Sequence, residues 1–453
     1  MAAKRIGFGS KLGIVLATAG SAVGLGNVWR FPYLTGENGG AAFLLIYIIC
    51  IFLLGIPGMV SEFVIGRHGQ ANAARSYDKL SQGRSWRWVG YLGIVTASII
   101  LGFYAVVAGW CLQYLYASIL GHVTGDAETV KNYFAAFSSD AVQPVVWGVG
   151  FILLTHLVIV RGVQKGIERV SKWLMPLLFI LLLVIVVASC MLPGAMEGVK
   201  FLFMPDFSKL SGSVMIEALG QAFFSLSLGT ACLCTYASYF SKTTNLLSTA
   251  GQIALLEVVI AIFSGLMIFP AAASVGISAD SGPSLIFITL PNVFQQAFGS
   301  VPAVGYVISV MFYALLVFAA LTSTISMHEI GTVFFSEELN LSRGRSAWIV
   351  TLSTSVLCWL CAWSVGAFPE LRLFDRSLMD CCDQLTANVL LLLGGLLSCL
   401  FVGWFAPRQT VYDELTNHGT VNQRTYRLLL MAIRYICPVG IILMFLYQTD
   451  FFV

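Results

Sequence analysis

Carboxylates and hydroxyls inside long apolar runs are the residues of this chain most able to do chemistry. Glu62 and Glu257 are two such carboxylates, and each costs about 2.5–3.5 kcal/mol at the centre of a membrane helix. Glu62 could accept hydrogen bonds from backbone N–H groups, and Glu257 could balance a bound cation. Acid–base catalysis also uses paired carboxylates, but no nucleophile or metal-ligand set accompanies them. The two residues therefore favour binding over catalysis.

Residues 18–32 interrupt the first apolar run with three glycines, an Asn, an Arg and a Pro. Each of these weakens a helix or is costly in lipid, and irregular backbone at membrane depth persists only where it is buried or lines a cavity. One interpretation is a broken helix with free carbonyls for a cation and free N–H groups for an anion. The other is a kinked helix with a glycine packing face. A second interrupted segment, residues 221–230, favours the broken helix.

Thr322 and Ser323 bring hydroxyl groups to an apolar depth later in the chain. Hydroxyls in this setting often hold helices together. Hard cations take oxygen ligands, and we expect Na⁺ to follow the preference of Ca²⁺ and Mg²⁺. Thr322 and Ser323 could therefore join the carbonyls of the broken helix around a cation.

The composition places the chain in a membrane. Hydrophobic residues make up 58% and charged residues 10% of the 453 residues, whereas soluble domains carry about 25% charged residues. Lys4 and Arg5 before the first apolar run resemble the start of a signal peptide, but the interrupted run continues to Pro32 and is expected to be retained. The five histidines form no metal-ligand pattern, and most of the eleven cysteines read as small apolar side chains. The expected surroundings are a lipid bilayer, and no nucleic-acid partner is expected.

Eleven segments are long and apolar enough to cross a bilayer. They cover approximately residues 11–36, 41–66, 88–120, 143–160, 167–190, 213–240, 248–277, 301–335, 346–366, 384–405 and 428–448. Of the 25 Lys and Arg residues, only six would fall on one side: Arg30, Lys131, Lys200, Lys209, Arg372 and Arg376. The positive-inside rule then predicts a cytoplasmic N-terminus and an extracellular C-terminus.

The two interrupted segments each open a set of five helices, so the sets would have opposite orientations. The predicted fold is an all-α polytopic membrane protein with eleven transmembrane helices: two inverted five-helix repeats (1–5 and 6–10), in which helices 1 and 6 are broken, plus one extra helix. Residues 1–453 would form a single transmembrane transporter domain, with repeat one at about 11–190, repeat two at about 213–405 and the extra helix at about 428–448. Discontinuous helices at matching positions point to a site at the membrane midplane.

Three further segments carry structural expectations. Gly166 and Pro176 in helix 5 mark either an ordinary proline kink or a half-helix that can unwind. Residues 281–291 are apolar for a loop and could form a re-entrant hairpin. Residues 408–424 read as a polar cytoplasmic loop.

Several motifs resemble those of the neurotransmitter:sodium symporter family. They are GSAVGLGNVWRFP at residues 20–32, FFSLSLG at 223–229, TYASY at 235–239 and LTS at 321–323. The resemblance covers essentially the whole chain. It implies sodium-coupled secondary active import of hydrophobic L-amino acids, aliphatic and aromatic, by alternating access. The chain is expected to lack the family's usual twelfth helix, so the resemblance does not predict the oligomeric state.

The resemblance also implies two sodium sites, with Na⁺ as the coupling ion. The first would use Ala22, Asn27 and Ser225. The family's ligand on helix 7 falls on Ile253, so that ligand is lost or is replaced by the nearby Glu257. The second would use Gly20, Val23, Ala319, Thr322 and Ser323. Animal members that need chloride carry a serine where this chain has Glu257, so transport here is expected to be chloride-independent.

The substrate site and gates follow from the same resemblance. The substrate-binding residues would be Ala22, Leu25, Gly26, Ile100, Tyr104, Phe224, Ser225, Ser227, Thr230, Ser323 and Met327. Arg30 and Asp383 resemble an outer gate, and Arg5, Tyr239 and Glu337 an inner gate. The expected location is a bacterial inner membrane. The alternative is a sodium-gated amino-acid sensor or channel-like protein that keeps the transporter fold.

Overall fold

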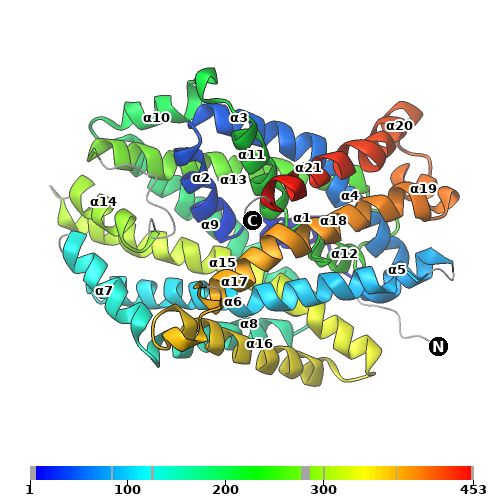
Figure 1. Ribbon diagram of the computed structural model, residues 1–453, viewed down its shortest axis with the longest axis horizontal. Helices are drawn as coiled ribbons and strands as arrows, with labels where there is room; N and C mark the ends of the chain where they lie inside the picture. The colour runs from blue at the N-terminus through cyan, green and yellow to red at the C-terminus, as the bar shows by residue number, and fades with distance from the viewer. Residues whose placement is uncertain are drawn as a thin grey trace.

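The helices lie side by side along the long axis of the molecule (Figure 1). The computed structural model describes residues 7–82, 85–123, 127–276, 286–298, 301–373 and 375–449. In these ranges there is no β-strand, and one antiparallel β-bridge joins Leu373 to Arg376. Arg5 and residues 281–285 of the predicted hairpin lie outside the described residues.

The elements follow the predicted segments closely, and short π- or 3₁₀-helical turns, labelled η, lie between several of them. Before residue 210 they are α1 (Lys11–Ala22), η1 (Gly26–Arg30), α2 (Phe31–Glu37), α3 (Ala41–Cys50), η2 (Ile51–Gly55), α4 (Ile56–Gly69), α5 (Ala73–Ser81), α6 (Arg87–Ile119), α7 (Ala127–Ser139), α8 (Gln143–Ile159), η3 (Val163–Glu168), α9 (Arg169–Cys190), α10 (Ala195–Phe203) and η4 (Phe207–Lys209). After it they are α11 (Gly212–Ser225), α12 (Cys232–Ala237), α13 (Leu246–Ser274), α14 (Thr289–Ala297), α15 (Pro302–Glu338), α16 (Arg343–Val365), η6 (Pro369–Leu371), α17 (Leu378–Leu385), η7 (Thr386–Leu390), α18 (Leu391–Leu400), η8 (Phe401–Phe405), α19 (Arg408–Leu415), α20 (Gln423–Met431), η9 (Ala432–Ile436) and α21 (Cys437–Thr449).

By length and apolar composition, eight helices in the described residues could each cross a membrane, or up to ten if each of two bent pairs forms one span. One bent pair is α1 with the segment Gly26–Glu37, which turn by 54° relative to each other. The predicted sixth helix is outside this count because α11 and α12 are each short. The helical pieces thus cover all eleven predicted segments, while helix length alone supports eight to ten spans.

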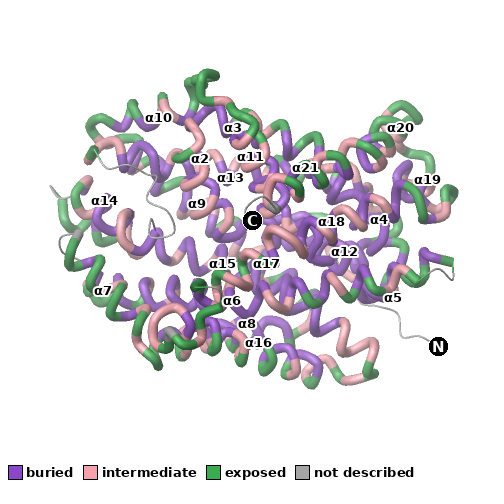
Figure 2. The backbone as a smooth tube through the Cα atoms, viewed as in Figure 1, coloured by how far each residue is buried: buried purple, intermediate pink, exposed green. Residues whose placement is uncertain are grey.

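The interior is built around α6 and α15, which pack against each other and against α8 and α16. Buried positions concentrate in the middle of the bundle, and exposed positions gather at peripheral elements such as α7 and α20 (Figure 2). Many outward side chains are nevertheless apolar, including Trp173, Leu352 and Leu446. An apolar exterior over helices of this length is what a lipid environment requires.

The segment expected to be a polar loop at 408–424 contains a docked helix, α19. Its Glu414 forms an ion pair with Arg67 at the end of α4, and the Arg67 side chain is 0% exposed. Arg67 also donates to Asn417 Oδ1 at 2.9 Å and to the Glu414 carbonyl at 2.9 Å. Burial opposes ionisation of Glu414, but hydrogen bonds from His68 and the nearby Arg67 lower its pKa overall. The ion pair explains the difference, because a buried arginine needs a partner and the loop supplies it.

Candidate functional site

The two predicted helix breaks meet at the centre of the bundle. We call residues 23–25 and 226–231 the paired breaks. In the first, Val23 leaves the helix with extended backbone (φ −82°, ψ 100°). The second has positive φ at Ser227 (54°), Gly229 (83°) and Ala231 (58°). A Cβ at Gly229 would lie 2.1 Å from the Leu391 carbonyl oxygen, so this position requires glycine.

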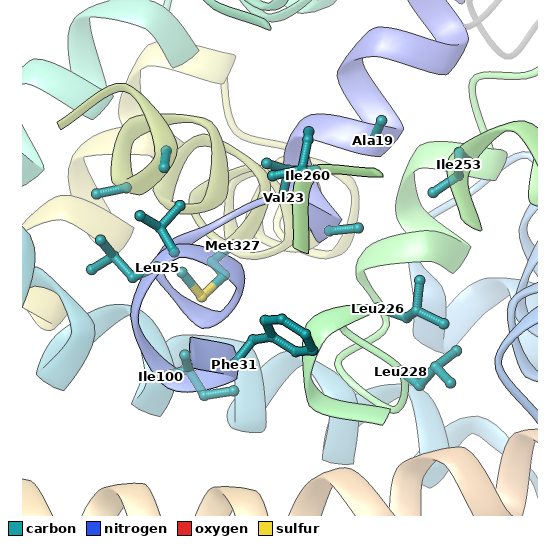
Figure 3. Close-up of a cluster of buried hydrophobic side chains, with 14 of the residues drawn as sticks. Ala19, Val23, Leu25, Phe31, Ile100, Leu226, Leu228, Ile253, Ile260 and Met327 are labelled. Atoms are coloured by element: carbon teal, nitrogen blue, oxygen red, sulfur yellow. The ribbon is translucent and has the colours of Figure 1, made fainter. Parts of the chain in front are cut away.

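Side chains join the segments around the paired breaks to each other. Ser227 Oγ donates to the Ser21 carbonyl at 3.0 Å, and Gln221 Nε2 donates to the Gly26 carbonyl at 3.1 Å. Figure 3 shows buried Val23 and Leu25 of the first segment, and Leu226 and Leu228 of the second, within one cluster. The free backbone groups of both segments are therefore close together inside protein.

Glu62 on α4 provides hydrogen-bond acceptors for backbone N–H groups at the second break. It accepts hydrogen bonds from the backbone N–H groups of Gly229 at 2.7 Å and Cys234 at 3.4 Å. The residue is 2% exposed. These are the hydrogen bonds that the sequence predicted for Glu62, and they give it an architectural position beside the site.

A pocket opens beside the paired breaks and contains most of the predicted substrate-binding residues. Its lining comprises Ser21, Ala22, Gly24, Gly26, Ile100, Tyr104, Phe224, Ser225, Ser227, Thr230, Cys232, Ser323, Ser326, Met327 and Leu391. Of the predicted set, Leu25 is outside the lining, but its N–H donates to Tyr104 Oη at 3.1 Å.

Sequence reasoning missed Ser21, Gly24, Cys232, Ser326 and Leu391 of this lining. The signal for Ser326 was present, because residues three apart share a helix face and Ser323 was already predicted. Gly24 has a steric role, since a Cβ there would lie 2.4 Å from Ser323 Oγ.

Glu257, Asn27 and Tyr47 form a buried cluster next to the pocket. Asn27 Nδ2 donates to Glu257 Oε1 at 2.8 Å, and the Tyr47 hydroxyl donates to the same oxygen. The Tyr47 hydroxyl also lies 3.0 Å from Ser225 Oγ. The structure thus gathers Asn27, Ser225 and Glu257 of the first predicted sodium site.

Three oxygens in this region have no hydrogen-bond partner among the described residues: Asn27 Oδ1, Gln221 Oε1 and Glu257 Oε2. Buried acceptors without donors are costly, and hard cations are bound by amide and carboxylate oxygens. The residues therefore fit a cation such as Na⁺. Ile253, the position to which the family resemblance assigns a ligand, is fully buried and its side chain offers no ligand atom.

The residues of the second predicted sodium site are also close together. Thr322 Oγ1 lies 2.9 Å from the Ala319 carbonyl oxygen and 3.3 Å from that of Val23. A Cβ at Gly20 would lie 3.3 Å from Thr322 Cβ, which brings the first and eighth predicted helices into contact here. Carbonyl and hydroxyl oxygens from two helices again suit a hard cation.

The predicted outer gate residues do not form an ion pair within 4.0 Å in the described part of the chain. The Arg30 guanidinium instead lies over the Phe224 ring, 4.5 Å from its centroid. Asp383 on α17 is exposed. Arg30 therefore lies against Phe224, which lines the pocket, while Asp383 stays solvent-accessible.

At the opposite end of the bundle, the Tyr239 hydroxyl donates to Glu329 Oε1 at 2.6 Å. Glu329 is 0% exposed and also pairs with Arg343. Sequence reasoning missed Glu329, although a carboxylate inside an apolar helix is the signal that identified Glu62 and Glu257.

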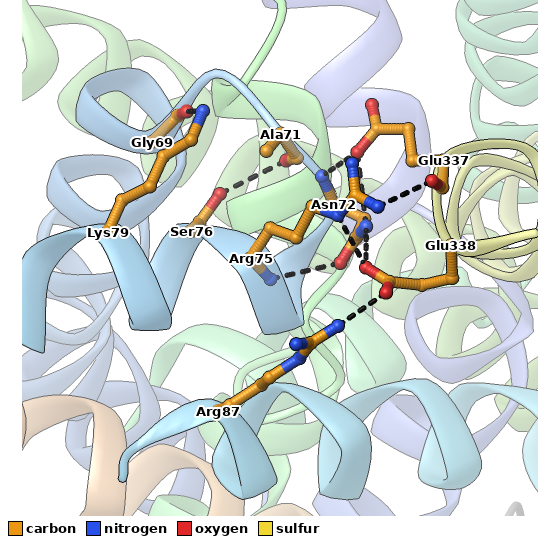
Figure 4. Close-up of polar contacts among 9 residues, drawn as sticks. All are labelled: Gly69, Ala71, Asn72, Arg75, Ser76, Lys79, Arg87, Glu337 and Glu338. Atoms are coloured by element: carbon orange, nitrogen blue, oxygen red, sulfur yellow. Dashed lines mark hydrogen bonds and ion pairs between the residues drawn. The ribbon is translucent and has the colours of Figure 1, made fainter. Parts of the chain in front are cut away.

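Glu337 of the predicted inner gate belongs to a neighbouring polar cluster (Figure 4). It accepts from the Asn72 backbone N–H at 2.6 Å and from Asn72 Nδ2 at 3.1 Å. The adjacent Glu338 pairs with Arg75 and Arg87. These contacts tie α15 to the start of α5 and α6.

The segment containing Gly166 and Pro176 is helical throughout Val163–Cys190, and Pro176 lies inside α9. Glu168, at the end of η3, accepts from the Gly9 N–H at 2.7 Å and from Ser10 Oγ at 2.9 Å. In this structure the segment has the helical arrangement of the proline-kink interpretation, and the N-terminal residues are attached to it.

Two known proteins match this chain over 90% or more of its length. The uncharacterized sodium-dependent transporter YhdH of Bacillus subtilis is 38% identical over 445 residues, which span 98% of this chain and 97% of that protein. The sodium- and chloride-dependent taurine transporter of Rattus norvegicus is 27% identical, with 90% of this chain and 72% of that protein covered.

A solved structure has the same fold. The crystal structure of MhsT in complex with L-phenylalanine matches with a TM-score of 0.89 and 38% identity, over 98% of this chain and 100% of that chain. Residues 5–132 and 138–452 match the profile of the sodium:neurotransmitter symporter family. With these matches and its apolar helices, the chain belongs to this family of polytopic membrane transporters.

Proposed function

We propose that this protein imports hydrophobic L-amino acids, aliphatic and aromatic, by sodium-coupled alternating access without a requirement for chloride. The observation that carries the proposal is the set of unpartnered buried oxygens on Asn27, Gln221 and Glu257 beside a pocket between two broken helices. The co-crystallised L-phenylalanine of MhsT supports an amino-acid substrate.

The pocket offers suitable groups for both ends of an amino acid. The substrate carboxylate would meet the N–H groups of Leu25 and Gly26 at the start of a helix, with the Leu25 N–H shared between the carboxylate and Tyr104 Oη. Because Tyr104 already accepts from Leu25, its hydroxyl proton remains free to donate to the carboxylate. The ammonium would meet carbonyls near Phe224, Ser225 and Ser227, where α11 ends.

Two coupling Na⁺ ions would be held next to this substrate. One would be held by Ala22, Asn27 and Ser225 with Glu257 nearby, and the other by Gly20, Val23, Ala319, Thr322 and Ser323. Bound Na⁺ supplies positive charge that attracts the substrate carboxylate. Two ions at a tenfold gradient and about 100 mV would provide about 7 kcal/mol, enough for roughly a 10⁵-fold accumulation of a zwitterion.

The membrane arrangement is part of the proposal. Eleven spans in a single domain, with inverted repeats at about 11–190 and 213–405, would place the N-terminus in the cytoplasm and the C-terminus outside a bacterial inner membrane. Arg30 and Asp383 would close the outer side. Arg5, Tyr239 and Glu337 would close the inner side, and we add Glu329 because it accepts from Tyr239.

Uptake into proteoliposomes tests this function against the sensor or channel alternative. With an inward Na⁺ gradient, labelled L-phenylalanine or L-leucine should accumulate above its external concentration. Collapsing the Na⁺ gradient should abolish accumulation. Uptake that only reaches equilibrium would support a channel, and Na⁺-dependent binding without uptake would support a sensor.

The pocket should discriminate by size at Thr230, where a bacterial member of the family carries phenylalanine. Thr230→Phe would fill the space beside Ile100 and Met327 in the lining, so L-tryptophan should lose at least tenfold in affinity while L-leucine changes little. Competition against labelled L-leucine measures this ratio. A wild-type protein that binds only glycine or alanine would contradict the predicted pocket size.

A further inference from the structure

Two hydroxyl groups, on Ser326 and Thr230, form one wall of the pocket together with Cys232. Ser326 is 2% exposed and Thr230 is 4% exposed. Ser326 lies one helical turn beyond Ser323 on α15, and Ser323 Oγ borders Gly24 at the end proposed for the substrate carboxylate. Ser326 contacts the Cys232 side chain, and the Cys232 N–H donates to Thr230 Oγ1. The Ser326 hydroxyl therefore lies near Thr230, which borders the part of the pocket proposed for the substrate side chain.

The protons of both hydroxyls are already used within the protein. Ser326 Oγ donates to the Ser323 carbonyl at 2.7 Å. Thr230 Oγ1 donates to the Ser227 carbonyl at 2.8 Å and accepts from the Cys232 N–H at 3.1 Å. A hydroxyl has one proton and two lone pairs. Towards the pocket, both groups can therefore only accept.

From this geometry we infer that Ser326 and Thr230 are specificity-determining residues that favour substrates whose hydrophobic side chain carries a hydrogen-bond donor. The chemical class is a phenol O–H, as in tyrosine, an indole N–H, as in tryptophan, or an aromatic amine. The inference rests on the proposed function, because it assigns a side-chain preference to the proposed amino-acid site.

The preference follows from the cost of covering an acceptor. A benzyl side chain would displace water from Ser326 and Thr230 without replacing its hydrogen bonds, whereas a donor on the ring would replace one of them. A net neutral hydrogen bond corresponds to about a fivefold to tenfold difference in affinity. The same wall should disfavour ring substituents that only accept, because their lone pairs would face those of the hydroxyls.

Equilibrium competition on the purified full-length protein in Na⁺ tests this inference with ligands of similar size. L-tyrosine and 4-amino-L-phenylalanine carry a donor, and L-phenylalanine and 4-fluoro-L-phenylalanine do not. We expect the donors to bind about fivefold to tenfold more tightly to the wild type. Ser326→Ala and the isosteric Thr230→Val should each lower that ratio towards one, because the donor loses its acceptor and the benzyl ring no longer covers one.

Ser264→Ala is the matched control, because Ser264 is also fully buried and donates to a carbonyl of its own helix, that of Ile260 at 2.8 Å, but lies outside the pocket. It should leave the donor ratio unchanged. Wild-type protein that binds L-phenylalanine without preferring the donors would overturn the inference alone, as would a preference that survives in both pocket variants. Wild-type protein with no Na⁺-dependent amino-acid binding would instead refute the proposed function. L-phenylalanine binding by each variant reports that the variant is folded.

Discussion

Glu257→Ser should convert the transporter into one that works only with chloride, whereas the wild type should transport equally in chloride and gluconate. Glu257 is fully buried, and its Oε1 accepts from Asn27 while its Oε2 has no partner in the described chain. A bound Na⁺ in such surroundings needs a compensating negative charge, since interactions there are several times stronger than in water. Without the carboxylate, a mobile anion would have to supply it.

The size of this effect should be large. Loss of the carboxylate leaves a buried cation uncompensated, and breaking such pairs costs about 3–5 kcal/mol. Uptake by Glu257→Ser in gluconate should therefore fall at least a hundredfold and recover when chloride is added. Uptake of labelled L-phenylalanine into proteoliposomes made in each anion measures both the loss in gluconate and the recovery in chloride.

Glu197→Ser provides the control for this experiment. Glu197 is an exposed carboxylate in the first turn of α10, so its removal should leave both the rate and the anion dependence unchanged. An active Glu257→Ser protein that is indifferent to the anion would show that Glu257 does not provide the compensating charge. A wild type that itself requires chloride would contradict the chloride-independent proposal.

Asn27→Ala should raise the Na⁺ concentration for half-maximal substrate binding by at least tenfold. The change removes two contributions at once: the unpartnered Oδ1, and the Nδ2 group that orients Glu257 at 2.8 Å. Losing a ligand and the positioning of a charged neighbour together should exceed the effect of a single neutral hydrogen bond. Titration of L-phenylalanine binding with Na⁺ at constant ionic strength measures the shift.

Asn422→Ala tests whether any loss of an asparagine would give the same result. Asn422 caps α20 by accepting from the Thr425 N–H at 2.8 Å and lies outside the pocket. Its replacement should reduce helix stability by about 1 kcal/mol and leave the Na⁺ titration unchanged. Substrate binding that never depended on Na⁺, in either the wild type or Asn27→Ala, would contradict the assignment.

The broken helices could be predicted because their signals are local. Gly24 and Gly26 weaken a helix at the first break, and Gly229 has a positive φ that few other residues adopt. Most of the pocket lining followed from these segments and from the family resemblance. These expectations depended on residues that are close in sequence or on continuous sequence motifs.

Contacts between distant helices could not be predicted in the same way. Arg67 and Glu414 are 347 residues apart, and their contact depends on how α4 and α19 pack against each other. Sequence periodicity gives the buried face of a helix but not its partner. The pairing of Glu329 with Tyr239 and Arg343 depends on the same kind of tertiary information.

The Arg67–Glu414 ion pair has a consequence for the order in which the protein is made. Its two residues are 347 positions apart, and at about 5–20 residues per second the ribosome needs roughly 20–70 s to add the intervening chain. Throughout that time the helix carrying Arg67 is already synthesised, while the carboxylate that neutralises its guanidinium does not yet exist. A charge of this kind cannot remain buried alone. This corner of the bundle must therefore stay open to water during synthesis and close among the last steps of biogenesis, after α19 has emerged.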